Sequence, residues 1–213
     1  MADKSLIEWT DATWNIVTGC SVVSPGCTNC YAMRLAGGRM QHHPSRVGLT
    51  TDSKAGPVWN GQVRFNEQWL TQPLGWKKPR KIFVAAHGDL FHEGVTDAQL
   101  DQIFAVMALC PQHVFQILTK RPERMRAYLT TDPVGRVLAW TDAVLDLSTT
   151  TPLSDASVYG AQETLSEGHT DLANIWLGVS VEEQARADER IPALLATRAA
   201  VRWISAEPLL GPV

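Results

Sequence analysis

The sequence predicts a parallel α/β fold, built either as a barrel or as an open sheet. Three observations predict it: short β-rich runs recur along the chain, most are apolar at nearly every position, and helical patterns lie between several of them. Strands buried on both faces have this continuous apolar character, and strands that alternate with helices are typical of parallel sheets. The predicted strands are residues 14–18, 62–65, 81–86, 114–119, 174–180 and 201–206.

Helices are predicted from apolar stripes and from signals at their ends. Residues 97–109 carry a stripe at helical spacing, and Thr96 with Gln99 is typical of a capping box at its start. Pro122 suits the first turn of a helix, because proline lacks the N–H that this turn leaves unpaired. The other predicted helices are residues 31–40, 122–129 and 182–199.

Two stretches lack a clear period. Residues 42–61 are rich in Gly, Pro and Ser and are expected to form a long loop. Residues 142–171 are polar and acidic, and we expect a long insertion or lid loop there, since loops of this length in compact domains are often functional. The whole chain, 1–213, is otherwise expected to form a single α/β domain.

The composition excludes several classes of protein. With 45% hydrophobic and 19% charged residues, the chain is not expected to be disordered. Its net charge of -3 removes the general case for a nucleic-acid-coating protein, although a local basic groove stays open. The sequence has neither an apolar run of membrane-spanning length nor an apolar N-terminal signal, so no membrane association and a cytoplasmic location are predicted.

Three cysteines form the central motif. Cys20, Cys27 and Cys30 lie within one short segment, between the first predicted strand and a predicted helix. In parallel α/β folds, sites form at the carboxyl ends of strands, which is where this segment falls. Such a cluster in a reducing compartment indicates a metal site rather than disulfides. The fourth cysteine, Cys110, ends an apolar helix and is expected to be a buried hydrophobic residue.

The cysteine spacing leaves the metal open. A 4Fe–4S cluster held by three cysteines leaves one iron free to bind a small molecule. A structural zinc ion requires four ligands, and His42 or His43 could supply the fourth. A segment without metal is the third alternative.

Polar residues at the ends of four further strands support a site on the same rim. Asp89, Lys120, Glu182 and Glu207 each follow a predicted strand. Each also has a simpler interpretation: Asp89 could cap a helix, for example, and Lys120 could be solvated. The basic residues after the fourth strand could hold a phosphate or carboxylate, or could form a solvated face, and they are Lys120, Arg121, Arg124 and Arg126.

Six ordered motifs carry a family resemblance that spans residues 9–213. WNIVTGCSVVSPGCTNCYA, GPVWNGQVRF, GDLFHEGV, FQILTKRPERM, NIWLGVSVE and VRWISAEPLLGP resemble a phage- and prophage-associated family of uncharacterised proteins, catalogued after phage gene products thirty-seven and sixty-eight. The family's three-cysteine motif is similar to that of radical S-adenosylmethionine (SAM) enzymes. The resemblance implies a partial TIM-like (β/α)6 barrel with parallel strands and a radical-SAM-like core, encoded by a phage or prophage in a bacterial host.

The resemblance also implies a function. Cys20, Cys27 and Cys30 would ligate a 4Fe–4S cluster whose fourth iron binds SAM, and an electron from a reductant protein would cleave SAM reductively. The phage setting makes a nucleic acid or nucleotide a candidate substrate. The candidate contacts to SAM or substrate are Tyr31, Asp89, Lys120, Ser180 and Glu207.

The chain departs from the resembled pattern in two ways. Six residues separate the first two cysteines, where radical SAM enzymes usually have three, and Asn29 replaces the aromatic residue before the third cysteine. The chain ends at EPLLGPV, before a further strand of the family, so we expect a C-terminally truncated member whose barrel is open at that edge. The alternative functions are a zinc-binding, non-catalytic nucleic-acid-binding or adaptor protein and an inactive prophage remnant.

Overall fold

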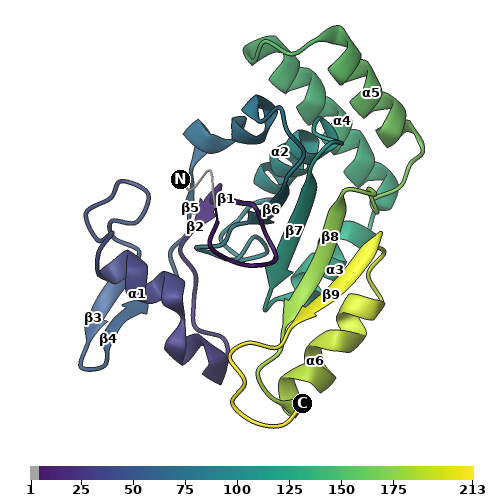
Figure 1. The fold of residues 1–213 in the computed structure, drawn as a ribbon. Coiled ribbons are helices and arrows are strands. Elements are labelled where there is room, and N and C mark those ends of the chain that lie inside the picture. The colour runs from purple at the N-terminus through teal and green to yellow at the C-terminus, as the bar shows by residue number, and fades with distance from the viewer. Residues whose placement is uncertain (1–4) are drawn as a thin grey trace.

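A computed structural model describes residues 5–213, with a five-stranded parallel sheet at its centre (Figure 1). The strand order follows the chain, and each strand is hydrogen-bonded in parallel to the next. The expected parallel α/β architecture is therefore confirmed, but within residues 5–213 the sheet stays open and forms no closed barrel. The strands are β1 (Ala12–Trp14), β6 (Lys81–Val84), β7 (Val114–Thr119), β8 (Ile175–Ser180) and β9 (Val201–Ser205).

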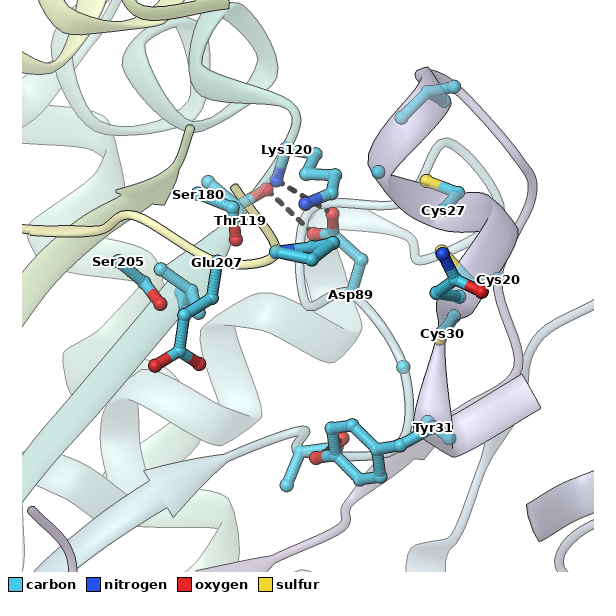
Figure 2. Close-up of a pocket in the computed structure, with 18 of the residues that line it drawn as sticks. Cys20, Cys27, Cys30, Tyr31, Asp89, Thr119, Lys120, Ser180, Ser205 and Glu207 are labelled. Atoms are coloured by element: carbon cyan, nitrogen blue, oxygen red, sulfur yellow. Dashed lines mark hydrogen bonds between the residues drawn. The ribbon is translucent and has the colours of Figure 1, made fainter. Parts of the chain in front are cut away.

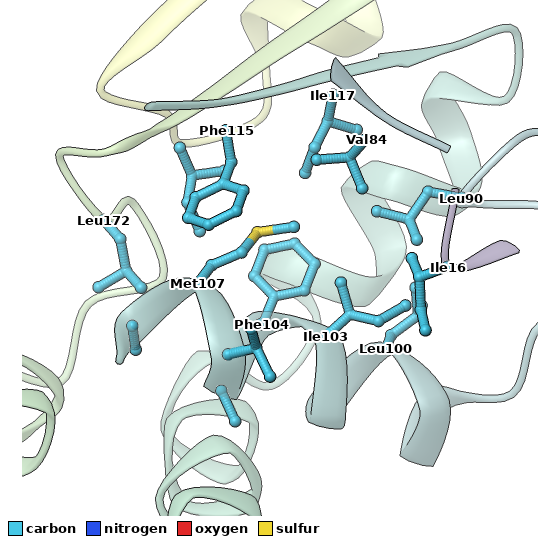
Figure 3. Close-up of a cluster of buried hydrophobic side chains, with 14 of the residues drawn as sticks. Ile16, Val84, Leu90, Leu100, Ile103, Phe104, Met107, Phe115, Ile117 and Leu172 are labelled. Atoms are coloured by element: carbon cyan, nitrogen blue, oxygen red, sulfur yellow. The ribbon is translucent and has the colours of Figure 1, made fainter. Parts of the chain in front are cut away.

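Helices follow the sheet strands along the chain and build most of the hydrophobic core. Figure 3 shows side chains of α2, including Met107, packed against Phe115 and Ile117 of β7. The predicted capping box is confirmed: the Thr96 hydroxyl accepts from the Gln99 N–H at 3.3 Å, and the Gln99 side chain accepts from the Thr96 N–H at 3.0 Å. The helices are α1 (Tyr31–Gly37), α2 (Asp97–Ala108), α3 (Pro122–Thr130), α4 (Pro133–Thr150), α5 (Asp155–Ser166) and α6 (Gln184–Leu195).

The segment before β1 lies on the other face of the sheet. The Trp9 ring centroid is 4.8 Å from that of Phe83 and 5.1 Å from that of Trp203, and the Gln116 side chain donates to the Trp9 carbonyl at 3.2 Å. Phe83 alternates with Ile82 and Val84, which belong to the helix-facing core. The sheet is thus covered on one face by helices and partly on the other by its own N-terminal segment.

Two of the six predicted strands do not join the parallel sheet as expected. The predicted strand at residues 14–18 divides into β1 and a separate pair of residues, β2 (Val17–Thr18). β2 pairs antiparallel with β5 (Arg64–Phe65), which lies within the predicted strand at 62–65. An apolar run alone cannot distinguish a two-residue antiparallel pairing from a buried parallel strand, which explains the error.

Residues 42–61 do not form a plain loop. They contain an antiparallel hairpin of β3 (Thr50–Ser53) and β4 (Gly56–Trp59), which packs on α1. α1 itself ends at Gly37, three residues before the predicted end. Little in the sequence marks the hairpin, because Trp59 is the one buried residue of its two strands and no apolar alternation runs along them. Short 3-10 turns complete the chain at η1 (Pro25–Asn29), η2 (Glu67–Trp69) and η3 (Gln72–Gly75).

The predicted lid loop at 142–171 is mostly helical. It is made up of the second half of α4, all of α5 and short connections. The buried residues Val137, Trp140, Val144 and Leu147 form a continuous helical stripe, which a boundary at residue 142 cuts in two. Among the described residues, no helix has both the length and the apolar character needed to cross a membrane.

Candidate metal centre and cofactor pocket

The three cysteines lie on a folded loop between β2 and α1, next to the carboxyl end of β1. Cys20 follows Gly19, which has a φ of 91° and whose Cβ would lie 2.3 Å from the Gln62 carbonyl oxygen, so a side chain there is strongly disfavoured. Cys27 sits in η1, and Cys30 is the N-cap residue of α1. All three are free thiols; Cys27 is buried, whereas Cys20 and Cys30 are half-buried.

The three cysteines line one cavity of about 620 Å³ (Figure 2). In Figure 2 they lie on one side of the cavity, while Ser180, Ser205 and Glu207 lie on the opposite side. The structure therefore brings together the eight residues predicted to bind the cluster, SAM or substrate, although the elements that carry them are far apart in the chain. The predicted residues among its lining are Cys20, Cys27, Cys30, Tyr31, Asp89, Lys120, Ser180 and Glu207.

Asp89 does not offer its carboxylate to the cavity as a free acceptor. Its two oxygens accept from the Thr119 hydroxyl at 2.7 Å, from the Arg121 guanidinium at 2.9 Å and from the backbone N–H groups of Phe91 and Lys120 at 3.0 and 3.1 Å. These four donors satisfy both oxygens of a buried carboxylate. Asp89 therefore connects the segment after β6 to the end of β7.

Arg121 connects Asp89 to the cysteine loop. Its side chain is 5% exposed, and its Nη1 lies 2.9 Å from Asp89 and 3.5 Å from the Cys20 Sγ. Its Nη2 donates to the Ser21 hydroxyl at 2.6 Å, and its Nε donates to Glu93. Burial and the Asp89 charge raise the pKa of Cys20 to about 12, against the opposing effect of Arg121.

Glu182 holds the other end of the loop. This fully buried residue accepts from the Gly26 N–H at 3.4 Å and from Arg190 at 2.9 Å, and the Lys120 Nζ lies 3.6 Å away. Burial alone would raise the pKa of Glu182, but a Ser24 hydrogen bond and the charges of Lys120 and Arg190 outweigh it and lower the pKa. A Cβ on Gly26 would lie 2.9 Å from the Glu182 carboxyl carbon.

The sequence did not predict that Arg121 and Glu182 contact the cysteine loop. The one sign of such a role in the sequence was their position shortly after buried strands. Their partners could not be inferred from it, because Gly26 and Glu182 are 156 residues apart in the chain.

On the opposite side of the cavity, three oxygen-bearing side chains have no partner within residues 5–213. The hydroxyls of Ser180 and Ser205 and the carboxylate of Glu207 make neither a hydrogen bond nor an ion pair there, and they can accept from a ligand. Tyr31 follows Cys30 directly, and its hydroxyl donates to the Ala86 carbonyl at 2.6 Å. The free acceptors therefore face the thiols across the cavity.

The remaining predicted ligands lie elsewhere. His42 and His43 are exposed and do not line the cavity, and the His43 Nδ1 is 2.7 Å from the Ser45 hydroxyl. Cys110 is fully buried, as expected, at the end of α2. Within residues 5–213, no group of three or more His, Cys, Asp or Glu side chains is arranged to hold a metal ion.

The basic cluster after β7 is largely neutralised by carboxylates of the same chain. Besides Arg121, Arg124 pairs with Asp97 at 2.6 Å and Arg126 pairs with Glu123 at 3.1 Å. Of this cluster, only Lys120 and Arg121 line the cavity.

Comparison with known proteins identifies the chain at the level of the family alone. Neither the curated proteins nor the solved structures include a match to it. A family model described as "Protein of unknown function (DUF5131)" matches residues 4–213. That description gives neither an activity nor a source, so the phage association and the radical-SAM-like chemistry stay predictions. Because the match covers nearly the whole chain, the protein belongs to the DUF5131 family.

Proposed function

We propose that this chain binds a 4Fe–4S cluster through Cys20, Cys27 and Cys30 and cleaves SAM reductively in the adjoining cavity. The observation that carries the proposal is the joint position of three free thiols on one side of a cavity, at the carboxyl ends of parallel strands. When bound, a cluster with one iron free of protein ligands supplies a binding position for SAM and the electron for its cleavage.

The thiols suit a cluster better than zinc. In a 4Fe–4S cluster each cysteine binds a different iron, so the sulfurs do not have to meet around one ion. A structural zinc ion needs four ligands around a single point, whereas the cavity lining supplies three cysteines and no histidine. The histidines suggested as the fourth zinc ligand, His42 and His43, lie outside the cavity lining.

The protein's own residues would position the cofactor and the ligand. Arg121 and Glu182 anchor the two ends of the cysteine loop to the sheet. Ser180, Ser205 and Glu207 provide acceptors for the amino and hydroxyl groups of SAM or substrate. Asp89 was expected to contact SAM or substrate. We propose instead that it orients Arg121, which contacts the cysteine loop.

An apolar region of the cavity would keep water from the reaction. Trp9, Phe83 and Leu118 contribute to its lining, and the segment carrying Trp9 packs over the sheet. Water exclusion strengthens electrostatic contacts within a site and protects reactive species from side reactions.

The experiment is anaerobic reconstitution with iron and sulfide, followed by iron and sulfide analysis and an assay for 5′-deoxyadenosine with SAM and dithionite. Wild-type protein should bind about four irons and four sulfides per chain and form 5′-deoxyadenosine. Cys27→Ala should lose both properties. Cys110→Ala is the matched control, because it also removes one thiol but lies outside the cavity, and it should keep both.

Other results would contradict the proposal. A colourless wild-type protein that carries one zinc ion per chain would support the zinc-binding alternative. Equal iron binding by wild type and Cys27→Ala would show that this cysteine is not a ligand. A bound cluster without 5′-deoxyadenosine formation would retain the iron–sulfur assignment and remove the SAM reaction.

A further inference from the structure

The charge of the chain is unevenly distributed around the cavity. Residues 31–65, which we call the basic arm, comprise α1, the β3–β4 hairpin and the chain up to β5. The arm has one acidic residue, Asp52, so its net charge is +4, and the rest of the chain therefore carries -7 within a total of -3. Its five cationic residues are Arg34, Arg39, Arg46, Lys54 and Arg64.

The cations of the arm are not neutralised by the protein. Among residues 5–213, none of the five is in an ion pair with a carboxylate. By contrast, seven arginines elsewhere in the chain each pair with one: Arg121, Arg124, Arg126, Arg136, Arg186, Arg190 and Arg198.

One arm cation is buried without a counter-charge. Arg46 is 2% exposed, its Nε has no partner among the described atoms, and its guanidinium meets only Ser45 and the neutral ring of His87. Burial and the charge of Arg64 lower the pKa of Arg46 to about 10. Keeping like charges together costs stability, and a bound anion would remove that cost.

The arm borders the cavity directly. Tyr31 and Trp59 belong to the arm and also line the cavity. Arg34 donates to the Asn29 side chain at 2.9 Å, and Asn29 is a lining residue, so this guanidinium lies at the rim. In Figure 1, α1, β3 and β4 lie together on one side of the parallel sheet.

The arm is a packed unit instead of a loose loop. Its small hydrophobic cluster includes Met33, Leu49 and Trp59. Gly37 faces the hairpin so closely that a Cβ would lie 2.1 Å from Pro57. The exposed cations Arg34, Arg39 and Lys54 are therefore held on a defined surface of a unit that borders the cavity.

We propose that the basic arm binds the phosphate backbone of a single-stranded nucleic acid, whose bases reach the cavity. Cations spread over a helix and a hairpin suit an anion that repeats along a polymer, and a single nucleotide would use only part of them. The exposed ring of Tyr31 at the mouth can stack with an unpaired base. That this nucleic acid is the substrate rests on the proposed function, whereas the binding itself does not.

The test is fluorescence anisotropy with a labelled mixed-sequence DNA or RNA strand of about 20 nucleotides, measured over a range of salt concentrations. The variant R34Q/R39Q/K54Q removes three exposed charges of the arm. The variant R126Q/R186Q/R198Q is the matched control, because it removes three charges outside the arm. Circular dichroism and thermal unfolding establish that both variants are folded.

We expect the arm variant to bind at least about tenfold more weakly than wild type, with the salt dependence of log K reduced by about 2. The control variant should stay within about twofold of wild type. Equal weakening in both variants would overturn the proposal, as would wild-type protein without salt-dependent binding. Arm-dependent binding to phosphatidylserine vesicles without binding to the oligonucleotide would assign the surface to a membrane instead and also overturn it.

The two proposals fail separately. Nucleic-acid binding by the arm in protein that assembles no cluster would leave this inference standing and remove the proposed function. Formation of 5′-deoxyadenosine by protein that binds no oligonucleotide would do the reverse.

Discussion

A single guanidinium organises the cysteine side of the cavity. Arg121 contacts residues of the cysteine loop, the end of β6 and the loop after it, and it carries the only positive charge within hydrogen-bond reach of Asp89 in the described part of the chain. Since Asp89 is buried, losing this partner would leave a buried carboxylate without a counter-charge. Arg121 thus contributes to folding as well as to the site.

Replacing Arg121 tests this dependence. Arg121→Met keeps an apolar stem but leaves Asp89 without its counter-charge, so the free energy of unfolding should fall by about 3–5 kcal/mol. Urea denaturation of the metal-free protein measures the change. The control Arg126→Met breaks an exposed pair and should cost less than about 1 kcal/mol. Equal losses in the two variants would show that the buried pair is not special.

Cys110 is chemically distinct from the cavity cysteines. It is fully buried, and burial raises its pKa to about 12, so near pH 8 it is a protected thiol. Iodoacetamide should label Cys30 in native, metal-free protein and label Cys110 only after unfolding. Mass spectrometry of the tryptic peptides resolves the two sites. Labelling of both at the same rate under native conditions would contradict the burial.

At the scale of elements, β8 and β9 depend on a missing side chain. Gly178 of β8 lies under the indole of Trp203 in β9, and a Cβ there would be 2.5 Å from the ring. The Trp9 ring lies 5.1 Å from the Trp203 ring, so the indole cannot move away from β8 without disturbing this contact.

Two glycine substitutions should therefore have opposite signs. Gly178→Ala should destabilise the protein by about 1–3 kcal/mol through overpacking. Gly160→Ala, in the middle of α5, meets nothing within 4 Å and should stabilise it by up to about 1 kcal/mol. Thermal unfolding of the two variants beside wild type decides the matter, and destabilisation by both would refute the steric argument.

The elements that the sequence predicted correctly are those with periodic buried residues. α2 has both a stripe and a capping box, and its start was found at the correct residue. The β3–β4 hairpin has neither signal, because its two strands bury one residue, Trp59. β2 and β5 were misassigned because their two-residue pairing depends on contacts across the chain: the Asn66 side chain donates to the carbonyls of Asn15 and Ile16.

At the scale of the whole molecule, the position of the site followed from topology. The strands are parallel, so their carboxyl ends meet at one rim, and any polar residue after a strand enters the same region. That argument gathered all eight predicted site residues around one cavity. The same argument could not say which side chains would be free to bind a ligand, because Asp89 and Glu207 both follow strands. The Asp89 carboxylate accepts hydrogen bonds from four donors of the protein, whereas Glu207 has no partner within residues 5–213.

The stability of the whole fold should depend on three histidines that are neutral in the native state. Burial and the charge of Arg46 lower the pKa of His87 to about 4, and burial also lowers the pKa values of His92 and His113. The unfolded chain binds these protons near pH 6.5, before the folded protein does. The free energy of unfolding should therefore be fully present above about pH 6.5 and fall as the pH is lowered from there towards 4.

Urea denaturation between neutral pH and about pH 5 measures this loss before most carboxylates titrate. His87→Gln keeps an acceptor for Arg46 but cannot take up a proton, so its stability should decline less steeply with falling pH than that of wild type. His169→Gln, at an exposed position, should follow the wild-type curve.

Because the pKa of His87 is lowered partly by Arg46, a polyanion bound to the basic arm should make the wild-type curve less steep. A curve for His87→Gln that coincides with wild type over the whole range would mean that folding does not lower the pKa of this ring. The charge of Arg46 would then not be uncompensated, and the arm proposal would lose that support.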